Sequence, residues 1–113
     1  MLERNNPTQL TYELFKSLSL ASQHILIRLG RDIGAGVSVL EKDLRAYIVD
    51  SSIGIKLGDF DAAVRDLVGR GLLDEACVTV RGKLEVTYVI NKQIEQFIEN
   101  DFARITQEQE LFS

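Results

Sequence analysis

Histidine and cysteine are the side chains most often found in metal sites and activated nucleophiles, and each occurs once among these 113 residues. A zinc site needs several such ligands together, and a nucleophile needs a base within hydrogen-bonding reach. His24 and Cys77 alone supply neither arrangement. The stretch "GAG" at 34–36 lacks the lysine and hydroxyl residue of a phosphate-binding loop. The sequence therefore predicts no catalytic residues, no metal and no cofactor, and Cys77 is expected to be a small buried hydrophobe.

Basic side chains are the remaining candidates for a binding chemistry. The net charge is −4, and most of the excess acid lies in residues 91–113, so the rest of the chain is nearly neutral. A neutral body does not attract nucleic acid as a whole, and DNA binding would need a local basic face. The best local signal is Arg81 and Lys83, which flank Gly82 at the tip of an expected hairpin. Their charges would either prevent the exposed sheet edge from pairing with another strand, or contact phosphate.

The segment "DFDAAVRDLVGRGLLDE" at 59–75 predicts a helix over 59–70, with Asp59 as its N-cap and Gly71 as its stop. Asp61 and Arg65 are four residues apart on its polar face. They could form a salt bridge worth a few tenths of a kcal/mol. Alternatively, Arg65 contacts DNA and Asp61 orients it or accepts from a cytosine. Further cations that could widen a basic patch are Lys42, Arg45 and Lys56.

Apolar periodicity predicts helices before this segment. "NPTQ" suggests that Asn6 caps a helix over 8–18 with Pro7 in its first turn. A second helix runs to residue 33, either starting after a Ser19 cap or continuing one long helix from residue 8. Ser38 and Glu41 form the pattern of a capping box, which predicts a third helix from residue 38.

The last part of the chain alternates and then becomes helical again. "ACVTVRGKLEVTYVIN" predicts two strands around the turn "RGK", with Asn91 capping a helix over 92–106 and a flexible tail over 107–113. The apolar stripe of this helix must be covered, either by the first helix or across a two-fold axis. Symmetric dimers are the commonest oligomers, so we favour a homodimer. Its predicted interface residues are Leu14, Ile94, Phe97, Ile98, Phe102 and Ile105.

Four stretches together resemble a winged helix-turn-helix domain: "LASQHILIRLG", "LEKDLRAYI", "AAVRDLVGRGLLDE" and "VTVRGKLEVTYVIN". The resemblance covers about residues 19–91 and implies an α+β, mostly helical fold with a β-hairpin wing and extra N- and C-terminal helices. It implies that 59–70 is the recognition helix and that the tip at 81–83 contacts the DNA backbone or minor groove. The loop over 50–58 is longer than the usual turn, and the expected recognition helix lacks the cluster of base-reading polar residues at its start.

These observations predict one domain over 1–113 that binds double-stranded DNA as a dimer, as a transcriptional regulator or a plasmid or phage control protein. The expected DNA-binding residues are Lys56, Asp61, Arg65, Arg81 and Lys83. The alternative is a winged-helix module that binds a protein partner and no DNA, and a third possibility is an accessory domain of an enzyme. No apolar run is long enough for a bilayer, and a lone cysteine suits a reducing cytoplasm.

Overall fold

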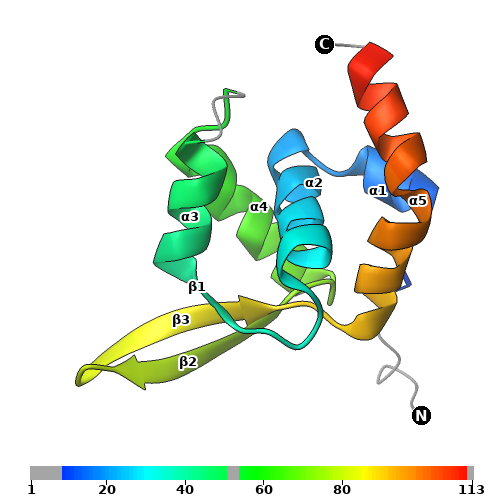
Figure 1. The fold of residues 1–113 in the computed structure, drawn as a ribbon. Coiled ribbons are helices and arrows are strands. Elements are labelled where there is room, and N and C mark those ends of the chain that lie inside the picture. The colour runs from blue at the N-terminus through cyan, green and yellow to red at the C-terminus, as the bar shows by residue number, and fades with distance from the viewer. Residues whose placement is uncertain (1–8, 51–53, 112–113) are drawn as a thin grey trace.

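The computed structural model describes residues 9–50 and 54–111, with side chains through residue 104. Within them the fold is α+β, mostly helical, with a three-stranded antiparallel sheet. The helices lie above the sheet, and its long hairpin projects beyond them at the lower left (Figure 1). The elements are α1 (Tyr12–Ser17), α2 (Leu20–Ile27), the π-helical continuation η2 (Arg28–Ile33), β1 (Val39–Leu40), α3 (Glu41–Asp50), α4 (Leu57–Gly69), β2 (Asp74–Val80), β3 (Lys83–Val89) and α5 (Lys92–Leu111).

The first two helices are separate. The Ser19 hydroxyl accepts a hydrogen bond from the Ser22 backbone N–H at 3.1 Å, and Leu18 before it is extended. The predicted Ser19 cap is therefore confirmed, and a single long helix is excluded because an N-cap residue has non-helical backbone angles.

The start of α1 differs from the prediction. The helix begins at Tyr12, and the Thr11 hydroxyl accepts from the Leu14 N–H at 3.1 Å, so Thr11 is its N-cap. A start at residue 8 was wrong because this threonine caps the helix further along the chain. The predicted roles of Asn6 and Pro7 lie outside the described residues.

The chain leaves η2 through Gly34, whose φ of 103° is closed to most other residues. It then forms β1, in which Val39 pairs with Tyr88 and Leu40 with Thr87 of β3. This pairing holds residues 39 and 40 extended, so α3 begins at Glu41. The capping box predicted to start at Ser38 was therefore wrong.

Helix α4 begins two residues before the predicted N-cap. Lys56 occupies the N-cap position, and the Asp59 carboxylate accepts from the Lys56 backbone N–H at 3.1 Å. Asp59 thus stabilises the helix start from the first turn rather than as the cap itself. At the other end Gly71 has φ 78°. The N–H groups of Gly71 and Leu72 donate to the carbonyls of Val68 and Leu67, which is the Schellman pattern expected of a glycine stop.

Helix α5 belongs to the same core as the other helices. Asn91 caps it as predicted, accepting from the Ile94 N–H at 2.9 Å. Ile94 and Ile98 are 0% exposed, and α5 lies at the right of the molecule, opposite the hairpin tip (Figure 1). The helix continues to Leu111, past the predicted end at 106. Residues 106–111 contain neither glycine nor proline and are rich in Glu and Gln, which favour helix.

Among the residues described, no helix combines the length and the hydropathy needed to cross a membrane.

Candidate nucleic-acid interface

The hairpin tip is a two-residue turn. Val80 pairs with Lys83, which leaves Arg81 and Gly82 between the strands. Their φ angles are 53° and 81°, and positive φ at both central residues is the signature of a type I′ turn. Gly82 adopts this conformation freely, but a left-handed residue with a Cβ costs roughly 1–2 kcal/mol. Arg81 therefore sits at a strained position that Asn or Gly would occupy more easily.

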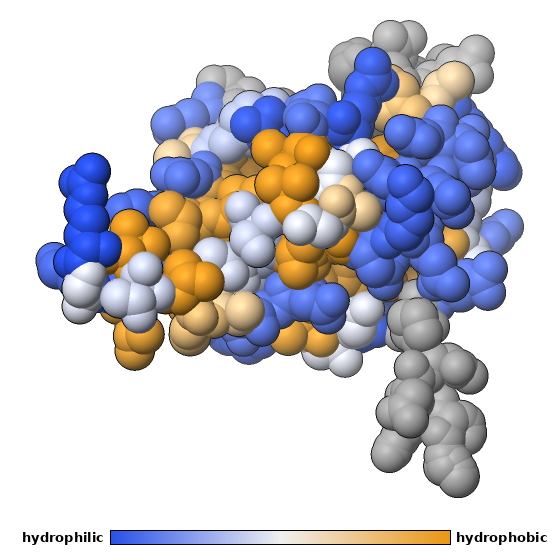
Figure 2. All heavy atoms as spheres, turned by 60° about the horizontal axis from the view of Figure 1, so that its bottom comes forward, coloured by the Kyte–Doolittle hydropathy of each residue, from blue (hydrophilic) through white to orange (hydrophobic). Residues whose placement is uncertain are grey.

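The strands next to this tip are open to solvent. The sheet order is β1-β3-β2, so β2 is an edge strand, and its residues from Asp74 to Thr79 are exposed. Cys77 is exposed as well, and its predicted burial was wrong because the strand extends away from the helices. Seen from below, hydrophilic side chains gather at the far left end and hydrophobic ones run inward from it along the hairpin (Figure 2).

On α4 the charged residues pair differently from the prediction. Asp61 lies 3.8 Å from Arg45 of α3, and Arg45 also lies 3.3 Å from Glu41. The Asp61 carboxylate is thus directed across to α3 and does not orient Arg65. Among the described residues Asp61 and Arg65 form no ion pair, and the Arg65 side chain is exposed.

Other cations near the site are neutralised. Lys42 pairs with Glu85 at 3.7 Å, and Arg70 pairs with Asp66 at 2.9 Å. Lys42 and Arg45, which could have widened a basic patch, therefore do not contribute free positive charge. In the part of the chain that the structure describes, the cations with neither an ion pair nor a ring contact are Lys56, Arg65, Arg81 and Lys83.

These four cations are the ones predicted to bind DNA, but they do not form one cluster. Arg81 and Lys83 share the hairpin tip. Lys56 precedes α4, whose start lies at the top of the molecule beside the end of α3, far from the tip (Figure 1). Arg65 lies about midway along α4. The structure therefore supports a basic tip with one further cation on α4, and leaves Lys56 apart.

A groove of about 480 Å³ separates α4 from the sheet, and Arg65 is on its wall. Three carboxylates line it too, those of Glu41, Asp61 and Glu75. The Tyr88 hydroxyl lies 3.3 Å from Glu41 and 3.4 Å from Glu75, to which it can donate. Burial, followed by these two carboxylates, raises the pKa of Tyr88. The groove floor thus repels phosphate, and Arg65 at its wall is the residue that could attract it.

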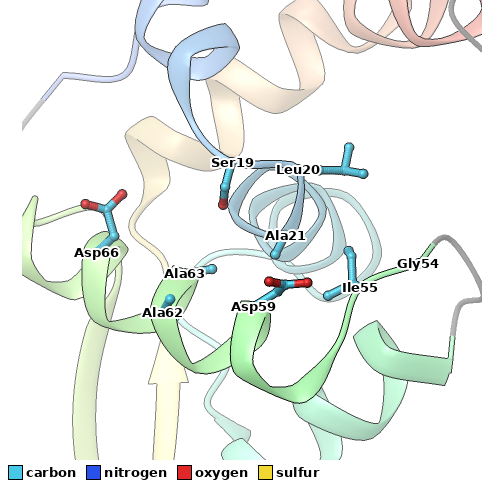
Figure 3. Close-up of a pocket in the computed structure, with 9 residues that line it drawn as sticks. All are labelled: Ser19, Leu20, Ala21, Gly54, Ile55, Asp59, Ala62, Ala63 and Asp66. Atoms are coloured by element: carbon cyan, nitrogen blue, oxygen red, sulfur yellow. The ribbon is translucent and has the colours of Figure 1, made fainter.

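A second hollow, of about 470 Å³, lies between the start of α2 and α4 (Figure 3). Ala21, Ala62 and Ala63 give it a small apolar floor, and Asp59 and Asp66 stand on the α4 side. It contains neither histidine nor cysteine. Across the described residues no group of three or more His, Cys, Asp or Glu side chains is placed to hold a metal ion.

The residues predicted for a dimer interface are mostly covered within one chain. Ile94 and Ile98 are fully buried, and the Phe97 ring lies 5.8 Å from that of Phe15 in α1. The Arg31 guanidinium stacks on Phe102 at 3.7 Å. Leu14 is half-buried against the core, and the side chain of Ile105 lies outside the described residues. Packing within the chain therefore covers most of the apolar stripe, with α5 lying mainly against η2 and with Phe97 packing on α1.

In comparison with known proteins, no protein-family model matches the chain, and no curated protein matches its sequence significantly. The hairpin tip, α4 and the two hollows are therefore the features from which a function can be inferred.

Proposed function

We propose that the chain is a winged helix-turn-helix protein that binds double-stranded DNA, with the β2–β3 hairpin as its wing and α4 as its recognition helix. The order α2, β1, α3, α4, β2, β3 is the order of elements in that fold. Such a protein would act as a transcriptional regulator or a plasmid or phage control protein. It would carry out no chemistry of its own.

The backbone conformation of Arg81 is the observation that carries this proposal. The residue occupies the first position of a type I′ turn at φ 53°, where Gly or Asn would be more stable. Strained backbone conformations cluster at functional positions, where the surrounding structure holds them despite their cost. Arg81 and its neighbour Lys83 are exposed. Neither is paired with a carboxylate within the described residues, so both remain available to phosphate.

Helix α4 has a smaller part. Arg65 is its one exposed cation without an ion pair in the described structure. The neighbouring carboxylates of Asp61 and Glu75 make the groove beside it acidic. Most of the electrostatic attraction would therefore come from the wing, and α4 would contribute one base or phosphate contact.

The test is a titration of fluorescent duplex DNA at two salt concentrations. We expect binding that weakens steeply with salt, since each phosphate contact contributes about −0.9 to the slope of log K against log salt. The variant Arg81→Ala/Lys83→Ala should bind more weakly with a slope smaller by about two contacts. The matched control is Lys16→Ala/Lys92→Ala, which changes the net charge equally but lies on α1 and α5.

Equal weakening by the two double variants would mean that net charge alone matters, and the wing assignment would fail. If the unaltered protein binds no duplex at low salt, the DNA-binding proposal fails as a whole.

That second result would favour a protein-binding module. The hollow between α2 and α4 supports this candidate, because Leu20 at its edge is 49% exposed. An exposed leucine beside an apolar floor is typical of a docking surface. Asp59 and Asp66 at the edge would select a basic partner segment.

A further inference from the structure

Leu84 is the most exposed of the large hydrophobic side chains that the structure describes, at 77%. It directly follows Lys83 and is the second residue of β3, next to the turn. Its partner across the hairpin is Thr79. An isolated leucine on a rounded surface needs no explanation, but this one stands at the tip of a projecting hairpin beside two unpaired cations.

The strand register fixes the face on which Leu84 lies. Alternate residues of a strand point to the same side, so Leu84 shares a face with Val86 and Tyr88. Tyr88 lines the groove below α4 together with Arg65. Leu84 therefore faces the side of the hairpin on which α4 lies, and DNA held between wing and recognition helix would meet it. Lys83 points to the opposite face.

We propose that Leu84 is an apolar wedge that enters the DNA minor groove and partly unstacks one base step, while Arg81 and, from the opposite face, Lys83 hold phosphates of the two strands that border the groove. The inference rests on the proposed DNA binding and specifies its mechanism. Leucine is among the side chains that architectural proteins insert in this way. Because the minor groove of B-DNA is only about 6 Å wide and paired strands lie about 4.8 Å apart, the leucine side chain rather than the hairpin itself would enter the groove.

The wedge defines the kind of DNA that the protein should prefer. Pyrimidine–purine steps such as TA and CA/TG unstack and kink most easily, whereas other steps resist deformation. A duplex with such a flexible step at the wing position should be bound more tightly and bent. Because bases next to a wedge need make no hydrogen bonds, this preference would arise from deformability rather than from base reading.

Two end-labelled duplexes that differ only in a central TA or GC step test the proposal, with affinity and end-to-end distance read from fluorescence transfer. The unaltered protein should shorten the TA duplex on binding. Leu84→Ala should abolish the shortening and weaken binding to the TA duplex by about tenfold, the effect of losing most of a buried leucine side chain. Leu84→Met should retain both effects, because it remains long and apolar.

Val78→Ala is the matched control, since Val78 is also exposed but lies on the other face of the hairpin. It should bend the TA duplex as the unaltered protein does. Salt-dependent binding without bending, or equal bending by Leu84→Ala, would overturn the wedge and leave the DNA-binding proposal standing. Absence of binding to either duplex would instead overturn the DNA-binding proposal, and the wedge with it.

Discussion

Gly30 of η2 lies directly against Ile98 of α5. A Cβ atom built on Gly30 would come within 2.8 Å of Ile98 Cγ1 and 3.0 Å of its Cβ, closer than packed carbon atoms approach. Ile98 is 0% exposed, so its side chain is enclosed by neighbouring atoms. The glycine thus sets the distance between α5 and the helices of the core.

Gly30→Ala should therefore destabilise the protein by about 1–3 kcal/mol, the usual cost of overpacking. Urea unfolding followed by circular dichroism measures it. Ile98→Ala should show favourable coupling with Gly30→Ala in a double-mutant cycle, because it removes Cγ1, the atom that the added methyl group would meet at 2.8 Å. Gly69→Ala in α4 is the control: nothing lies within 4 Å of its added Cβ, and the change should be neutral or stabilising by up to about 1 kcal/mol. Equal effects of the two alanines would contradict this packing.

Arg81→Gly should separate stability from binding. Glycine removes the left-handed strain at φ 53°, so we expect the free energy of unfolding to rise by about 1 kcal/mol. The same change removes a cation from the hairpin tip, and the DNA affinity that we propose should fall. A more stable protein that binds more weakly is the trade-off expected where function maintains strain. A fall in stability would show that the arginine side chain holds the turn in place.

The sequence predicted the elements whose signals are local. The alternation around Gly82, the glycine stop at Gly71 and the Asn91 cap all depend on residues within a few positions of each other, and each was confirmed. Long-range contacts produced two of the errors. Because residues 39 and 40 pair with β3, α3 begins at Glu41 and not at Ser38. Asp61 pairs with Arg45 of α3 and not with Arg65.

The sequence could not decide either whether the apolar stripe of α5 is covered by its own chain or by a second copy. An apolar stripe is the same whether it packs on its own chain or on a second copy, and only the position of η2 and α1 shows that Ile94 and Ile98 are internal. The strain at Arg81 was likewise hidden, because it depends on the exact two-residue register of the hairpin. A turn prediction that compared Arg-Gly with the favoured Asn-Gly could have suggested it.

Phe97→Ala distinguishes an internal α5 from an interface helix. Because Phe97 packs on Phe15 at 5.8 Å within one chain, its truncation should lower the free energy of unfolding by about 2 kcal/mol. Sedimentation should show the same oligomeric state before and after the change. Conversion of a dimer to a monomer with unchanged unfolding would support the prediction that this stripe joins two subunits.

His24 should make stability depend on pH in the weakly acidic range. It is half-buried in α2, and burial lowers its pKa from the ordinary 6.5 because the charged ring is less well solvated there. The unfolded chain then binds a proton more readily than the folded one, so stability is complete above the ordinary pKa and falls as the pH drops below it. Unfolding in urea at pH 7.5 and 5.5 should show the loss, and His24→Gln should reduce it. At lower pH, protonation of Glu95 should reduce the stability further, because the Ala35 N–H and Lys92 lower the pKa of Glu95 in the folded state. An equal pH dependence in His24→Gln would place the titrating group elsewhere.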